Sequence, residues 1–182
     1  MLMTRIRGCV VLLVISAGMA AGQSQPKNDW SGWQPFLGTW SGSGNGEPGK
    51  GNGEFSFVPE LQGAVLIRHS YAEYPASKDK PAYRHDDLML IYSDAGGKTR
   101  ADYWDNEHHV IHYEVALSDT KLTFTSEAAH PGPHYRLTYM KTGDDTLKMT
   151  FEIAPPNDPS KFKIYIEAAA RRKGADSRPG TQ

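Results

Sequence analysis

Apolar and polar residues alternate along most of the chain between residues 29 and 173. Successive side chains of a β-strand point to opposite faces of the sheet, so this alternation predicts strands with one buried and one exposed face. The predicted buried faces are Val65, Ile67, His69 and Tyr71; Ile111, Tyr113, Val115 and Leu117; Tyr135, Leu137 and Tyr139; Leu147, Met149, Phe151 and Ile153; and Phe162, Ile164, Ile166 and Ala168. About ten strands are expected, with no helical period apart from a turn around residues 29–35.

Turn-forming residues separate these segments at intervals typical of an all-β protein, for example at residues 94–97, 118–119 and 143–145. Strands of this kind can pack as two sheets or close into a barrel. Closure removes the exposed edges, so we expect an all-β fold, a single antiparallel up-and-down β-barrel of about ten strands. Ten closed strands enclose more space than small side chains fill, which predicts an interior pocket.

The N-terminal 22 residues have the pattern of a signal peptide. Arg5 and Arg7 precede a short apolar stretch that is too short for a typical membrane-spanning helix. Small residues follow, so we expect cleavage before Gln23, with cleavage after Ala20 and an uncleaved anchor as the alternatives. The prediction is therefore a signal peptide (1–22), a disordered leader (23–28), a barrel domain (29–173) and a disordered tail (174–182). Such a protein would be periplasmic or secreted, with no stable membrane anchor after cleavage.

Composition excludes some classes of function. Cys9 is the only cysteine and lies within the predicted signal peptide, so the mature chain would have no disulfide, no thiol nucleophile and no thiolate metal site. Loss of Arg5 and Arg7 moves the formal charge only from −1 to −3. No basic stripe is present, so we do not expect nucleic-acid binding. The sequence does not indicate the oligomeric state.

The segment Phe36 to Gly46 reads Phe-Leu-Gly-Thr-Trp-Ser-Gly-Ser-Gly-Asn-Gly. It resembles the Gly-x-Trp signature of lipocalins and other calycins, and is closer still to the Leu-Gly-Thr-Trp-x-Gly-x-Gly-x-Gly of nitrobindins. Segments 70–75, 86–92 and 106–113 resemble lipocalin-like bacterial proteins of unknown function. The resemblance covers nearly the whole predicted domain and implies a barrel, but it brings no established substrate.

The resemblance also implies roles for Gly38 and Trp40. In lipocalins this tryptophan stacks beneath a basic residue of the final strand, a role that Arg171 or Arg172 would have here. Nitrobindin-like barrels bind haem through a histidine near the C-terminal strand, but residues 161–172 contain no histidine. No cofactor is therefore predicted, and haem is retained as an alternative.

Seven histidines invite a metal hypothesis. On a strand, His108 and His112 would share a face but lie about 13 Å apart, too far to ligate one ion together. We therefore predict no metal site and a polar outer face at both residues. His85, His130 and His134 fall at predicted loops or strand ends, where solvent exposure is the default.

The candidate ligand-binding residues are the inward aromatic and histidine side chains His69, Tyr71, Tyr103, His109, Tyr113 and Tyr139. Their histidines would either hold a polar head group or simply hydrogen-bond a tyrosine. The first hypothesis is that the protein binds a small apolar or amphipathic molecule. The alternatives are a haem or nitric-oxide binding protein, a purely structural module, and an unrecognised enzyme with acidic residues at the barrel mouth. Those acids would be Asp86, Asp87, Asp102, Asp105 and Glu107. No catalytic residue is predicted, because no motif places a nucleophile beside a base.

Overall fold

The computed structural model describes residues 28–127 and 132–174. Those residues form ten β-strands and two short 3-10 helices. In chain order the elements are η1 (Ser31–Trp33), β1 (Gly38–Gly46), β2 (Gly51–Glu60), η2 (Leu61–Gly63), β3 (Val65–Tyr74), β4 (Tyr83–Ser93), β5 (Thr99–Asp105), β6 (Val110–Leu117), β7 (Lys121–Ser126), β8 (His134–Gly143), β9 (Thr146–Ala154) and β10 (Lys163–Arg172). The predicted signal peptide lies outside the described residues, as do residues 23–27 of the predicted leader and 175–182 of the predicted tail. Within the described ranges, no helix is long and apolar enough to cross a membrane.

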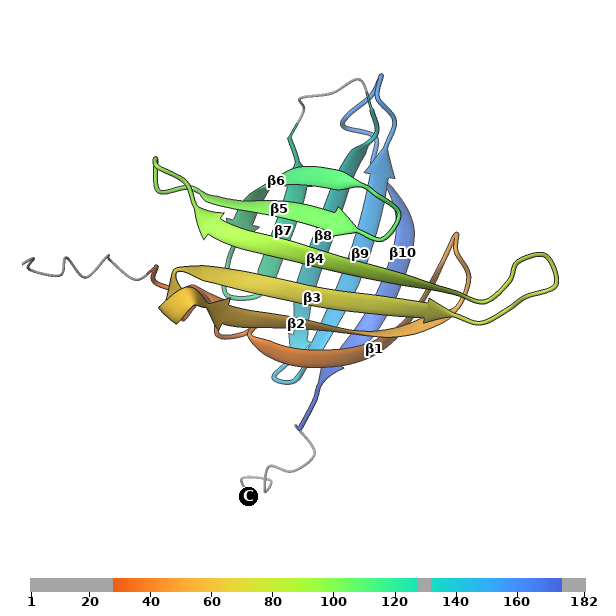
Figure 1. The fold of residues 1–182 in the computed structure, drawn as a ribbon, viewed down its shortest axis with the longest axis horizontal. Coiled ribbons are helices and arrows are strands. Elements are labelled where there is room, and N and C mark those ends of the chain that lie inside the picture. Colours follow the sequence, from red (N-terminus) through yellow and green to blue (C-terminus); the bar gives the residue numbers. More distant parts are fainter. Residues whose placement is uncertain (1–27, 128–131, 175–182) are drawn as a thin grey trace, which may run out of the picture.

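The strands form one closed barrel in which each pairs antiparallel with its neighbours in sequence. β1 closes the sheet by pairing with β10, and in Figure 1 strands β2–β6 cross in front of β7–β10. The predicted up-and-down barrel is confirmed, and the two-sheet alternative is wrong. A direct turn joins β1 to β2, as the Gly/Pro-rich sequence there predicts.

Glycines allow the first and last strands to approach closely. Gly44 lies opposite Ala168 in the β1–β10 pair. A Cβ atom added to Gly44 would lie 2.7 Å from the Ala168 Cβ atom and 2.7 Å from the Glu167 carbonyl oxygen. The glycine run in β1 thus removes side chains where barrel closure leaves no room for them.

One end of the barrel is filled by a hydrophobic core. Trp33 of η1 is buried there and packs against Phe57 and Phe124, with ring centroids 6.0 and 6.4 Å away. Trp40 is fully buried, and its indole N–H donates to the Phe36 carbonyl oxygen at 2.9 Å. The segment before β1 therefore closes this end, which we call the closed end of the barrel, defined by Trp33, Phe36 and Trp40.

Of the two candidates for the basic residue over Trp40, the structure has Arg172 there and not Arg171. The Arg172 guanidinium carbon lies 4.1 Å from the centroid of the Trp40 ring. Its Nη2 atom donates to the Pro35 carbonyl oxygen at 3.0 Å, and its Nε atom bonds Asp145 at 2.9 Å. Arg171 immediately precedes Arg172 on β10, so its side chain points to the opposite, outer face and is exposed.

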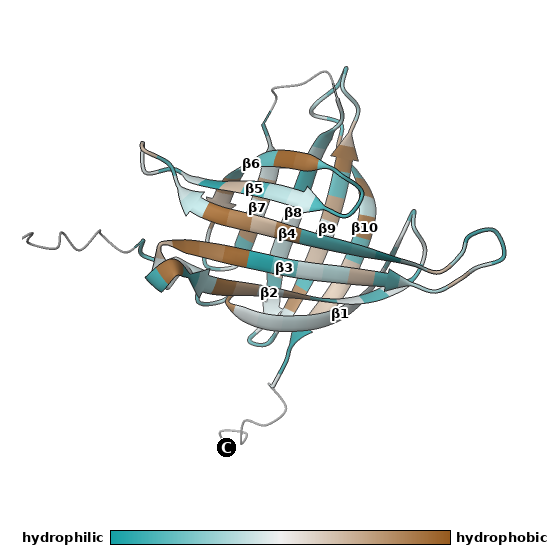
Figure 2. Ribbon diagram, in the orientation of Figure 1, coloured by the Kyte–Doolittle hydropathy of each residue, from teal (hydrophilic) through white to brown (hydrophobic). Residues whose placement is uncertain are grey.

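The predicted alternation is confirmed on β8 and β9 but wrong on β3, and on β10 it holds only after a bulge. On β3 the inward residues are Leu66, Arg68 and Ser70, so Val65 and Ile67 lie on the opposite face. Figure 2 shows the apolar parts of β3 and β4 side by side; beyond them β4 is hydrophilic, whereas β3 is of mixed character. On β10 an irregularity between Ile164 and Ile166 changes the phase, which leaves Ile164 57% exposed.

Candidate functional site

The barrel interior contains a cavity of about 340 Å³ at the end opposite the closed end. Its apolar lining comes mainly from β6, β8, β9 and β10, and consists of Ile111, Tyr113, Tyr135, Leu137, Met149, Phe151, Ile153, Tyr165 and Ile166. The turn between β1 and β2 contributes Pro48. The side of the cavity formed by β6 and β8–β10 is therefore walled by rings and aliphatic chains.

Arg68 forms the floor of the cavity. It is 5% exposed, and its guanidinium carbon lies 5.8 Å from the centroids of both the Phe55 and Tyr139 rings. The Arg68 Nε atom donates to the Tyr139 hydroxyl at 2.7 Å, and Nη1 forms an ion pair with Asp87. The Asp87 side chain is 6% exposed. A buried charged pair thus lies between the aromatic core and the cavity.

The polar wall continues from Asp87 to the mouth of the barrel along β4 and β5. The His85 Nε2 atom lies 3.8 Å from Asp87 and 3.0 Å from the Tyr103 hydroxyl. The Tyr103 hydroxyl donates to Asp105 at 3.1 Å, and the same Asp105 oxygen lies 2.8 Å from His109 Nδ1. Strand register creates this chain of contacts, because alternate residues of β4 and β5 point inward side by side.

Tyr103 has one hydroxyl proton and two polar neighbours that accept it. When it donates to Asp105, His85 must present an N–H at Nε2, and the other ring nitrogen of His85 then lies 3.2 Å from the Glu107 carboxylate. When it donates to His85, the bond to Asp105 is lost. The position of the N–H on the His85 ring and the orientation of the Tyr103 proton are therefore coupled.

Burial sets the charge state of the phenols around the floor. It raises the pKa of Tyr139 to about 12, opposed by the nearby Arg68 charge. It also raises the pKa of Tyr103, to which the charges of Asp87 and Asp105 add, and that of Tyr113. These phenols are neutral hydrogen-bonding groups at physiological pH.

The pKa shifts of Arg68 and Asp105 favour their ionised forms. Burial by itself lowers the pKa of Arg68, but the charge of Asp87, the nearby Tyr139 and Tyr103 and the hydrogen bond to Tyr139 together outweigh it, so the net shift is upward. Burial raises the pKa of Asp105, but the backbone and side-chain hydrogen bonds from His109 have a larger opposite effect. The pKa of Asp105 therefore falls below its ordinary value. The cavity therefore keeps both a fixed cation and fixed anions.

Of the six predicted ligand-binding residues, Tyr103, His109 and Tyr113 line the cavity. Tyr139 lies beneath it, fully buried, and contributes its hydroxyl to Arg68. Their role in binding stays a prediction. His69 and Tyr71 do not face the cavity, and this part of the prediction is wrong because β3 has the opposite phase.

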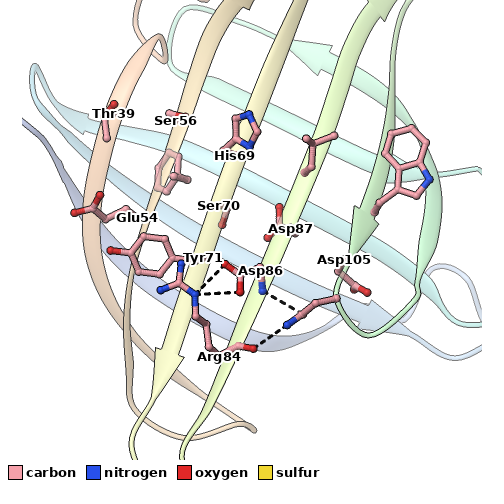
Figure 3. A pocket seen from close by; sticks show the side chains of 14 residues that line it. Thr39, Glu54, Ser56, His69, Ser70, Tyr71, Arg84, Asp86, Asp87 and Asp105 are labelled. Atoms are coloured by element: carbon pink, nitrogen blue, oxygen red, sulfur yellow. Dashed lines mark hydrogen bonds and ion pairs between the residues drawn. The ribbon is translucent and has the colours of Figure 1, made fainter.

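His69 and Tyr71 instead line a hollow on the outer face of β2–β5, with a volume of about 560 Å³. Figure 3 shows both on β3, with the Arg84 guanidinium over the Tyr71 ring, its carbon 3.9 Å from the ring centroid. Arg84 also bonds Asp86 and Glu73 at exposed positions. The hollow is larger than the interior cavity, but its charges are in contact with solvent, where such pairs contribute little.

Sequence reasoning missed Arg68 and placed His85 at a solvated loop or strand end. His85 points inward from β4 and its side chain is only 22% exposed. The sequence does contain a signal for the inward position of His85. Tyr83, His85 and Asp87 occupy alternate positions of β4, and the same alternation continues to the buried Met89 and Ile91. Asp87, Asp105 and Glu107 were foreseen only as acids at the mouth.

His108 and His112 lie on the outside, as predicted. His108 is exposed in the turn before β6, and His112 is exposed and bonds Asp102 at 2.6 Å. Among residues 28–127 and 132–174, no group of three or more His, Cys, Asp or Glu residues is arranged to hold a metal ion.

Comparison with known proteins reveals structural likeness at low sequence identity. No family model matches the chain, and no curated protein matches it. Similar solved structures include a de novo designed fluorescence-activating β-barrel (13% identity, 77% of this chain and 95% of that chain covered, TM-score 0.40). Another is EF1p2_mFAP2b bound to DFHBI (10% identity, 78% and 97% covered, TM-score 0.39). A third is a protein of unknown function of the DUF3598 family from Nostoc punctiforme (7% identity, 81% and 100% covered, TM-score 0.28).

Proposed function

We propose that the protein binds a small amphipathic molecule inside the barrel. The observation that carries the proposal is the cavity of about 340 Å³ with an aromatic and aliphatic wall on one side and a hydrogen-bonded polar wall on the other. Binding sites for small molecules have this composition, a mostly apolar concave surface with a few convergent polar groups. The apolar body of the ligand would lie against Tyr113, Leu137 and Phe151, and its polar group against the β4–β5 wall.

A purely structural role explains the polar wall poorly. A buried ion pair such as Arg68–Asp87 costs desolvation energy, and apolar residues of similar volume often stabilise a protein as well or better. A barrel that needed only stability would fill its interior with apolar side chains, as the closed end does around Trp33 and Phe36. Retention of charged groups beside an open volume favours a role in recognition.

Two measurements test the proposal. Fluorescence titration measures the binding of Nile red, an uncharged hydrophobic dye, and native mass spectrometry of the purified protein detects a co-purifying small molecule. The test variant is Ala72→Phe, which places a ring in the cavity. The matched control is Ala116→Phe, at an exposed position of β6. We expect saturable dye binding that Ala72→Phe abolishes and Ala116→Phe retains. Absence of both dye binding and a co-purifying small molecule would contradict the proposal.

Export to the periplasm or the medium is part of the same proposal and rests on residues 1–22 alone. Cell fractionation and N-terminal sequencing of the full-length product test it. The expected mature N-terminus is Gln23 or Ala21, and an intact N-terminus in the cytoplasmic fraction would contradict it.

Haem binding is the second candidate, favoured by one observation. His109 lines the cavity, and Asp105 accepts a bond from its Nδ1 atom, which leaves Nε2 as the nitrogen able to bind a metal. Bound haem would supply an iron centre for small diatomic ligands. Hemin titration should then give a sharp Soret band that His109→Ala removes and that His69→Ala, on the outer face, leaves unchanged. A flat titration would eliminate this candidate.

A further inference from the structure

Arg68 has more hydrogen-bond donors than the protein uses. A guanidinium carries five N–H groups. The Nε group bonds Tyr139 and Nη1 bonds Asp87, and no other acceptor contacts Arg68 among the residues that the structure describes. In the same residues, no buried side-chain nitrogen or oxygen lacks a partner. The Nη2 donors are therefore not sealed off, and Arg68 borders the cavity as well as a smaller adjoining hollow of about 80 Å³.

The charge of Arg68 is already balanced. Asp87 lies against Nη1, and both side chains are only 6% exposed. The other acidic and basic side chains of the cavity wall, apart from phenols, are Asp105, Glu107, His85 and His109. The lining thus holds one guanidinium group and three carboxylate groups besides its two histidines, although its floor offers N–H donors.

The accessible N–H donors of Arg68 and the neighbouring Asp87 carboxylate together determine which polar group of a ligand fits there. An anionic group at Nη2 would lie close to the Asp87 carboxylate in a poorly solvated site, where like charges repel strongly. An uncharged oxygen accepts the same N–H donors without that repulsion. A purely apolar group would leave the donors without a partner and would displace the water that otherwise satisfies them.

We infer that the inner end of the cavity receives an uncharged carbonyl-type oxygen, as in a ketone, amide or ester, and that Asp87 makes the cavity reject carboxylates. The inference rests on the proposed binding function and specifies its ligand class. The apolar body of that ligand would be flat and aromatic, because Tyr135 and Phe151 already stack at 5.9 Å in the cavity wall and present ring surfaces.

The test uses three naphthalene probes of nearly equal shape, 2-acetylnaphthalene, 2-naphthoate and 2-ethylnaphthalene, as competitors of Nile red at pH 7. We expect 2-acetylnaphthalene to bind about tenfold more tightly than each of the other two, the size of effect expected for a hydrogen bond to a charged donor. Equal affinity for the ketone and the carboxylate, or for the ketone and the hydrocarbon, would overturn the inference.

Asp87→Asn provides the second measurement, because it removes the compensating charge and keeps the side-chain shape. The expected result is a gain of at least about tenfold for 2-naphthoate, so that the carboxylate overtakes the ketone. Asp86→Asn is the matched control, since Asp86 lines the outer hollow and bonds Arg84 there. It should leave the order of the probes unchanged.

The outcomes separate the two levels of the proposal. If neither Nile red nor any naphthalene binds, the binding function itself fails. If the dye and 2-ethylnaphthalene bind but the ketone has no advantage, binding stands and the inference about the carbonyl oxygen fails. Circular dichroism monitors the fold of Asp87→Asn, and the probe series on the unmodified protein decides the question even if that variant does not fold.

Discussion

Asp105 organises the mouth of the cavity at the scale of a single residue. One of its carboxylate oxygens accepts the backbone N–H groups of Glu107 and His109, each at 2.9 Å. The other oxygen accepts the Tyr103 hydroxyl and contacts His109 Nδ1. The Asp105 side chain is only 3% exposed. One carboxylate thus holds the turn before β6 and orients two side chains of the polar wall.

These bonds predict a dependence of stability on pH. The pKa of Asp105 is lower in the folded protein than its ordinary value of about 3.9, so the ionised form stabilises the fold above about pH 4. That contribution is lost as the pH falls through the folded pKa. Asp105→Asn should lower the free energy of unfolding by about 2 kcal/mol at pH 7, and the difference from the unmodified protein should shrink below about pH 4. Urea denaturation at pH 7, 5 and 3 measures it, and an equal difference at all three values would contradict the prediction.

Arg172 is the corresponding residue at the closed end, where it joins Trp40, the Pro35 carbonyl and Asp145. A lysine keeps the charge but lacks the planar group that makes these contacts together. Arg172→Lys should therefore reduce the free energy of unfolding by about 2 kcal/mol. Arg171→Lys, one residue away and outward, should change it by less than about 0.5 kcal/mol. Equal effects in chemical denaturation would mean that the contact with Trp40 is unimportant.

At the scale of elements, the pairing of β3 with β4 decides where polarity lies in the barrel. Each strand has an apolar half and a polar half, and antiparallel register sets Leu66 opposite Ile91 and Ser70 opposite Asp87. The apolar halves join the core and the polar halves form part of the cavity wall. A shift of one residue in either strand would place Arg68 or Asp87 outside.

Closure of the barrel depends on β1 and β10, which meet where β1 has glycine at alternate positions. Gly44→Ala would put a methyl group 2.7 Å from the Ala168 Cβ atom. The same methyl group would lie 2.7 Å from the Glu167 carbonyl oxygen, which belongs to the backbone and cannot move aside easily. We therefore expect a loss of about 2 kcal/mol in the free energy of unfolding. Gly132→Ala is the control, since a Cβ there meets nothing within 4 Å. If both variants unfold at the same urea concentration as the unmodified protein, the two strands are not packed as tightly as described.

At the scale of the whole molecule, stability and recognition occupy opposite ends of one barrel. Trp33, Phe36 and Trp40 fill the closed end, whereas the other end combines open volume with buried charge. The layer of Arg68 and Tyr139 separates them. Changes at the closed end should therefore affect folding more than binding.

The buried phenols predict an alkaline limit for the whole fold. The protein has nine tyrosines. Burial raises the pKa of Tyr139 to about 12, and the pKa values of Tyr103 and Tyr113 are raised as well. Phenols with a raised pKa stabilise the folded state below the ordinary value of about 10, and this stability is lost as the pH rises from there toward the folded pKa.

Ultraviolet titration at 295 nm, with circular dichroism as the monitor of folding, tests this prediction. Tyr103, Tyr113 and Tyr139 should contribute little phenolate absorbance at pH 11 while the fold persists, and should ionise together with unfolding at higher pH. Ionisation of all nine in one transition near pH 10 with a native dichroism spectrum would contradict it.

The amino-acid sequence by itself determined the barrel, the approximate number of strands and the inward faces of β6, β8 and β9. These features depend on local alternation and on turn residues, which are visible in a single segment. On β3 the rule failed because Val65, Leu66 and Ile67 are all apolar and supply either phase. If Val65 and Ile67 are taken as the inward residues, the alternation places Arg68 on the outer face, although it is buried inside the barrel.

Only the tertiary structure decided which side chains form the site. Arg68, Asp87 and Tyr103 lie on three strands, and the register of those strands brings them together although no local pattern links them. The face of β3 and the bulge in β10 were likewise set by contacts with neighbouring strands. Local chemistry specifies that strands form, whereas the register across a closed sheet specifies which of their polar residues meet inside it.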